Sequence, residues 1–142
     1  MPRSTYRAIA LALAATFAGV GLVFCFTPGS VAAFFSLPSR WSALPAGDIE
    51  DGLFRVLAAA YMYLVAWLAW KMFARPDEAM WPAILAQAKL ASAAFSVVLI
   101  LLNGPTLVLV ANAIVDGLLG ALAFWLRRQV LRRGTGGQAA AS

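Results

Sequence analysis

Three ionisable side chains interrupt long apolar stretches of this sequence. They are Arg55, Lys89 and Asp116. If these stretches are membrane helices, each charge costs about 2.5–3.5 kcal/mol on insertion scales, and such residues are candidates for function by default. Asn112 lies four residues before Asp116 and adds an amide to the same helical face. These four residues are the candidates for binding a ligand or a proton.

Asp116 lies deepest in its apolar segment. It follows Pro105 by eleven residues and precedes Arg127 by eleven, which places it roughly 16 Å from either end of a helix. A short carboxylate side chain cannot reach the aqueous phase from that depth. One interpretation is a carboxylate that binds a proton or a polar ligand group. The other is a structural ion pair or hydrogen bond between helices, which burial produces equally well.

Lys89 lies seven residues into the apolar segment 82–102, roughly 10 Å from its start. Ser92 and Ser96 share its helical face, so the ammonium group can point into a bundle and pair with Asp116. Helical side chains lean toward their own N-terminus, however, which tilts these two away from each other in antiparallel helices. The alternative is that Lys89 extends along its stem to the lipid headgroups.

Arg55 lies close to the start of the second apolar segment and follows a cluster of acidic residues. The cluster consists of Asp48, Glu50 and Asp51. Because Asp51 precedes Arg55 by four residues, an ion pair along the helix is expected. Together these residues can form a polar lid that binds a lipid headgroup or a quinone-like carbonyl. The simpler interpretation is an interfacial salt bridge.

The composition of the 142-residue chain is that of a membrane protein. Hydrophobic residues make up 63% and charged residues 12%, against about 45–50% and about 25% in soluble domains. The net charge is +5, but the basic residues lie at the ends of apolar segments and form no basic face for nucleic acid. The sequence contains no histidine and one cysteine, Cys25. Histidine-ligated metal and haem sites and Ser-His catalysis are therefore excluded, and we predict no catalytic residue, metal or cofactor.

Four apolar segments are long enough to cross a bilayer core of about 30 Å as helices. They cover about residues 8–26, 51–74, 82–102 and 106–126. A secretory signal peptide is the alternative for the first, but its uncharged run exceeds the usual ~7–15 residues of such signals. The predicted fold is all-α, with four transmembrane helices in an antiparallel bundle that forms one domain over residues 1–133. Residues 134–142 are expected to form a disordered cytoplasmic tail.

The connections between the segments differ in length. The first connection contains three prolines and an apolar stretch, 31–37, that is too short to span. We expect this stretch to lie in the membrane interface. Tight turns are predicted at 75–78 and 103–105, where proline and glycine interrupt the helical pattern. Short turns make the last three helices antiparallel neighbours.

The basic residues predict the orientation. Eight of the eleven flank the N-terminus, the second connection and the C-terminus, and they are Arg3, Arg7, Lys71, Arg75, Arg127, Arg128, Arg132 and Arg133. Since arginine and lysine in short loops stay in the cytoplasm, we expect a multi-pass protein of the bacterial inner membrane with both termini cytoplasmic.

Small residues recur at four-residue spacing and predict close helix contacts. Examples are Ala10, Ala14 and Ala18, then Ala88, Ser92 and Ser96, then Ala113, Gly117 and Ala121. Tyr61 and Tyr63 fall in the middle of the second segment. They can line an apolar pocket, but packing or lipid contact is the commoner role of such residues.

The layout resembles the DoxX-like group of small bacterial membrane proteins. The resemblance covers the four-span plan, the start of the second span with Glu50, Asp51 and Arg55, and the pair Asp116-Gly117 in the fourth. It implies a four-helix membrane fold and, for part of that group, an association with membrane redox enzymes. It assigns no catalytic residue and no cofactor.

A proton- or cation-coupled exporter would need a membrane carboxylate such as Asp116, but the charge bias fixes one orientation and disfavours the antiparallel dual-topology dimer of small exporters. Two other functions are compatible with these features. The first is a non-catalytic subunit or scaffold of a membrane complex, with lipids and either other subunits or further copies of the chain as partners. The second is a binder, transporter or enzyme for a lipophilic or quinone-like molecule, with a polar intramembrane site around Asp116. Small size and the absence of histidine favour the first function, while the intramembrane charges favour the second.

Overall fold

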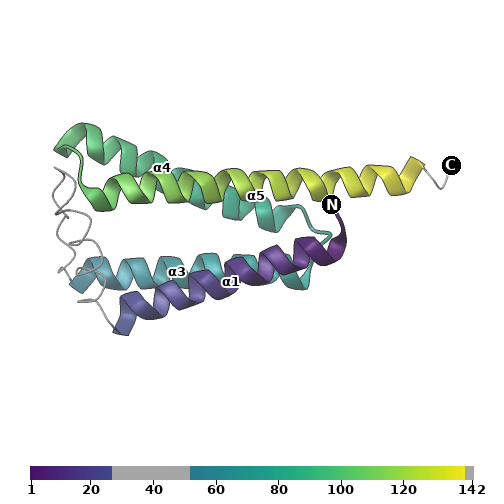
Figure 1. Ribbon diagram of the computed structural model, residues 1–142, viewed down its shortest axis with the longest axis horizontal. Helices are drawn as coiled ribbons and strands as arrows, with labels where there is room; N and C mark the ends of the chain where they lie inside the picture. Colours follow the sequence, from purple (N-terminus) through teal and green to yellow (C-terminus); the bar gives the residue numbers. More distant parts are fainter. Residues whose placement is uncertain (27–51, 140–142) are drawn as a thin grey trace.

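Four long α-helices form the part of the chain that the computed structural model describes, residues 1–26 and 52–139 (Figure 1). They are α1 (Arg3–Phe26), α3 (Gly52–Ala74), α4 (Met80–Asn103) and α5 (Leu107–Ala139). Each is long and apolar enough to cross a membrane. The predicted all-α fold with four transmembrane helices is thereby confirmed. The interfacial segment expected at 31–37 lies outside the described residues.

The helices are arranged as two antiparallel pairs. Helix α1 packs along α3 and helix α4 along α5, and the closest approach between the pairs is that of α3 to α4 (Figure 1). The side chains that point away from these contacts are large and apolar, among them Leu101, Phe95 and Leu118. Such a surface suits lipid, because hydrocarbon chains solvate it without the cost that water imposes. The chain is therefore a multi-pass integral membrane protein.

Both predicted tight turns are present, and local hydrogen bonds explain where the helices end. After α3, the Glu78 N–H donates to the Arg75 carbonyl at 3.2 Å. Helix α4 ends at Gly104, whose N–H donates to the Ile100 carbonyl at 3.0 Å. The φ angle of Gly104 is 88°, a conformation that favours glycine. Pro105 follows and cannot continue the α4 hydrogen bonds.

The apolar core occupies one half of the bundle, on the side of the turn between α3 and α4. Its buried residues are Tyr6, Ala10, Ala14, Phe17, Val65, Leu68, Ala69, Met72, Leu85, Ala86, Ala123, Leu126 and Val130. On α1 and α5 they recur every three or four residues, as expected for faces that meet at a common axis. Ala10 and Ala14 belong to the small-residue row predicted for the first helix. The core ends near the middle of the bundle, where the polar residues begin.

Helix α5 is longer than the sequence predicted. The predicted span ended near residue 126, with a disordered tail from 134, but α5 continues to Ala139. Two contacts account for the extension as far as Arg133. Val130 packs into the core, and the Arg133 guanidinium donates to the carbonyls of Met1 at 3.1 Å and Pro2 at 3.2 Å. Once nucleated, a helix extends at little cost, and glycine weakens it by only about 1 kcal/mol per residue.

Candidate functional site

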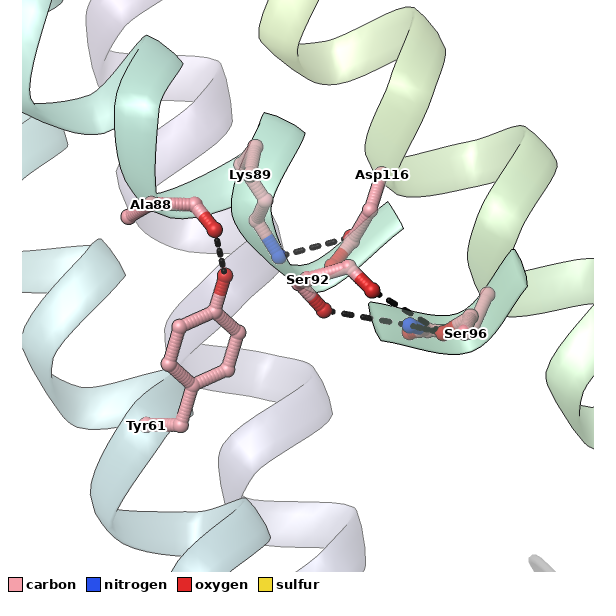
Figure 2. Close-up of polar contacts among 7 residues, drawn as sticks. Tyr61, Ala88, Lys89, Ser92, Ser96 and Asp116 are labelled. Atoms are coloured by element: carbon pink, nitrogen blue, oxygen red, sulfur yellow. Dashed lines mark hydrogen bonds and ion pairs between the residues drawn. The ribbon is translucent and has the colours of Figure 1, made fainter. Parts of the chain in front are cut away.

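A buried ion pair joins α4 to α5 in the middle of the bundle. The Lys89 Nζ lies 2.8 Å from the Asp116 Oδ1 (Figure 2). The two side chains are 1% and 4% exposed, so neither charge reaches lipid headgroups. Of the two alternatives for Lys89, the structure has the pair with Asp116. The flexible four-carbon stem of lysine overcomes the opposite tilt of the two side chains.

Two aromatic rings from the other helix pair enclose the ammonium group. Phe17 of α1 and Tyr61 of α3 each have their ring centroid 4.8 Å from the Lys89 Nζ. A cation at that distance is attracted to the face of the ring, most strongly when water is excluded. The Tyr61 hydroxyl also donates to the Ala88 carbonyl of α4 at 3.1 Å (Figure 2). All four helices therefore contribute to the surroundings of Lys89.

An amide and two hydroxyl groups extend the polar cluster away from the apolar core. The Asn112 Nδ2 donates to the Ser92 Oγ at 3.1 Å and to the Ser96 Oγ at 2.8 Å. The Ser96 Oγ donates in turn to the Ser92 carbonyl at 3.0 Å. Lys89, Ser92 and Ser96 follow each other by three and four residues, so they form one stripe on α4. This stripe faces Asn112 and Asp116, which are one turn apart on α5.

Loss of the amide of Asn112 is expected to weaken the α4–α5 contact moderately. Asn112→Ala removes two interhelical hydrogen bonds, which average about 0.6 kcal/mol each in membrane proteins. We expect the unfolding free energy to fall by about 1 kcal/mol when measured by SDS titration in mixed micelles. Asn103→Ala is the matched control, because Asn103 is exposed at the end of α4, and it is expected to have little effect. Equal stability of the two variants would contradict this role of Asn112.

One oxygen of the polar cluster lacks a hydrogen-bond partner among the described residues. The Asp116 Oδ2 is buried and accepts no hydrogen bond from the described residues. A buried acceptor of this kind ordinarily has a partner, and leaving one unpaired costs about 1–3 kcal/mol or more when the group is charged. Asp116 therefore combines a structural contact through one oxygen with an unused acceptor on the other. A proton, or the hydrogen-bond donor of a ligand, would satisfy that second oxygen.

Most of the expected polar lid lies outside the described residues. Arg55 lies near the start of α3, at the end of the bundle away from the apolar core, whereas Lys89 and Asp116 lie near its middle. Asp48, Glu50 and Asp51 lie outside the described residues, as does the predicted contact between Asp51 and Arg55. Of the four candidates, the structure thus brings together Asp116, Asn112 and Lys89.

Two further residues of the cluster have aromatic side chains. The sequence indicated packing or lipid contact for Tyr61 and gave no reason to select Phe17, because a phenylalanine in an apolar segment carries no polar group. Their proximity to Lys89 depends on how the two helix pairs meet, which is a tertiary feature. The signals of the cluster that could be read in advance were the spacing of Ser92 and Ser96 from Lys89 and that of Asn112 from Asp116.

Comparisons with known proteins add no further assignment. No family model matches the chain, and no curated protein or solved structure matches it. The case for a function therefore depends on the geometry of the cluster and on the surface of the bundle.

Proposed function

We propose that the chain is a non-catalytic subunit or scaffold of a membrane complex in the bacterial inner membrane, with both termini in the cytoplasm. The orientation is supported by the distribution of basic residues, eight of which flank the predicted cytoplasmic ends. Membership of the DoxX-like group, and with it an association with redox enzymes, belongs to the same proposal. Its support is the four-span layout together with the acidic residue and glycine of the fourth span.

The observation that carries this proposal is the mutual pairing of the polar side chains. Lys89 forms an ion pair with Asp116 and cation–π contacts with two aromatic rings. Asn112 donates hydrogen bonds to Ser92 and Ser96. A catalytic or transport site directs such groups toward its substrate. In this bundle they join one helix to another, which is the role of polar residues as interhelical contacts in membranes.

The proposal is tested by replacing the charges and keeping the packing. The double variant Lys89→Met with Asp116→Leu removes the ion pair but retains apolar volume, and buried pairs often tolerate such a replacement. Affinity purification from native membranes in mild detergent, followed by mass spectrometry, is expected to recover the same partner proteins with this variant as with the wild-type chain. Loss of the partners from a variant that remains folded would contradict a purely structural role of the ion pair, and the absence of any partner from the wild-type purification would contradict a scaffold role.

The unpaired Asp116 Oδ2 supports a second candidate, a binder of a lipophilic or quinone-like molecule. The hydroxyl group of a reduced quinone is a donor that this oxygen would accept. Solvent extraction of the purified chain and mass spectrometry of the extract test this candidate directly. A small molecule present with the wild-type chain and absent from Asp116→Asn would favour it over the scaffold.

A further inference from the structure

An apolar groove runs along the outer face of the α1–α3 pair, away from the polar cluster. It has a volume of about 470 Å³ and is lined by Leu11, Ala14, Ala15, Ala18, Tyr63, Ala66, Trp67 and Trp70. On each helix the lining residues follow the spacing i, i+3, i+4, i+7, so each helix contributes one continuous face. Alanines form most of the floor, and the larger aromatic residues of α3 form a wall. The groove is roughly 10 Å long, the rise of seven helical residues.

One end of the groove is positively charged. Arg7 precedes Leu11 by one turn on α1 and stacks on the Phe73 ring, with 4.5 Å between its Cζ and the ring centroid. Phe73 in turn contacts Trp70, a lining residue, with ring centroids 5.2 Å apart. The Lys71 Nζ lies 5.0 Å from the centroid of the Trp67 ring, which also lines the groove, and 5.8 Å from that of Trp81 on α4, which does not.

These two cations have no carboxylate to neutralise them among the described residues. The ion pairs there use Arg3 with Asp77, Arg75 with Glu78 and Lys89 with Asp116. Arg7 and Lys71 also lie where the apolar segments 8–26 and 51–74 begin and end. That position is the level of the lipid headgroups.

We propose that this groove is a binding site for an anionic phospholipid, with one acyl chain against the alanine floor and the phosphate at Arg7 and Lys71. The apolar lining suits a hydrocarbon chain, and the two cations match the charge of an anionic headgroup. Aromatic stacking holds both cations in place, so little side-chain entropy remains to be lost on binding. Basic pockets between transmembrane helices bind anionic headgroups by the same chemistry.

The test is lipid titration of the detergent-purified chain, with bound lipid counted by native mass spectrometry. Dioleoyl phosphatidylglycerol is expected to bind more tightly than dioleoyl phosphatidylcholine. The double variant Arg7→Gln with Lys71→Gln is expected to weaken phosphatidylglycerol binding about fivefold per cation, roughly 25-fold in total. Arg128→Gln is the matched control, because Arg128 also stacks on an aromatic ring, 4.8 Å from Phe124, but does not line the groove. It is expected to leave the affinity unchanged.

A second pair of variants tests the apolar part of the site. Ala15→Leu with Ala18→Leu fills the floor of the groove and is expected to reduce the binding of both lipids. Ala12→Leu adds the same side chain to an exposed position of α1 outside the groove and is expected to have no effect. Equal affinity for the two lipids would overturn the proposal, as would an equal loss from Arg128→Gln. A dimer that the filled groove converts to a monomer, with lipid binding unchanged, would also overturn it and assign the groove to a second copy of the chain.

Discussion

Replacement of Asp116 by alanine is expected to lower the free energy of unfolding by about 3–5 kcal/mol. The reason is that Lys89 is 1% exposed, so the variant leaves a buried ammonium group without its counter-charge. The loss is measured by SDS titration in mixed micelles, with helix content followed by circular dichroism. Asp116→Asn is expected to lose less, because the amide oxygen still accepts a hydrogen bond from the Lys89 Nζ.

Two further variants show whether the missing counter-charge causes this loss. Asp77→Ala removes an ion pair with Arg3 in which both side chains are more than 60% exposed, and exposed pairs contribute about 0–1 kcal/mol. The double variant Lys89→Met with Asp116→Leu removes both buried charges and is expected to regain most of the stability lost by Asp116→Ala. Wild-type stability of Asp116→Ala, or a further loss in the double variant, would exclude the proposed role of the pair.

The four spans were predictable because they depend on quantities that can be read one segment at a time. Length, hydropathy and the turn residues around Pro76 and Gly104 identified four spans, and the described helices agree with them. The C-terminal end of α5 was not predictable in the same way. It depends on the burial of Val130 and on the contacts of Arg133 with the start of the chain, both of which require the folded bundle.

The candidate site also has features that could be read from the sequence and others that depend on how the helices pack. Depth along a helix follows from counting residues, so Asp116 was placed near the middle of the bundle from the sequence alone. Which side chain faces Asp116 depends on the rotation of α4 against α5. The tendency of helical side chains to lean toward their own N-terminus argued against Lys89, but its flexible four-carbon stem reaches Asp116 in the structure. The aromatic partners Phe17 and Tyr61 depend on a third and a fourth helix and had no sequence signal.

The position of the cluster at the margin of the core supports a role in holding the helix pairs together. The buried apolar residues occupy the half of the bundle next to the turn between α3 and α4. Lys89 lies where this packing ends, and it contacts residues of the three other helices. Lipid provides no hydrophobic drive for helix association. Polar and cation–π contacts at this position therefore specify how one pair sits on the other.

Gly120→Ala is expected to destabilise the protein by about 1–3 kcal/mol, although alanine is the better helix former. A Cβ atom at Gly120 would lie 2.7 Å from the Cγ of Leu90 and 3.2 Å from its backbone nitrogen, so the Leu90 side chain must shift and the α4 backbone must yield locally. Gly117→Ala is the matched control one turn earlier. Its Cβ would meet the Ala93 Cβ at 4.0 Å, an ordinary contact, and the substitution is expected to be neutral or to stabilise by up to about 1 kcal/mol. SDS titration of both variants compares them directly.

The same substitution also tests whether close packing and the ion pair act as a unit. Leu90 is adjacent to Lys89 on α4, and Gly120 is one turn from Asp116 on α5, so displacement of Leu90 also displaces the ammonium group. We therefore expect Gly120→Ala and Asp116→Ala to be non-additive, with a coupling energy of about 0.5–3 kcal/mol, as for residues in one contact network. Because Gly120→Ala already weakens the ion pair, Asp116→Ala has less to remove in its presence. Additive losses would mean that Gly120 sets the distance between the helices without positioning Lys89.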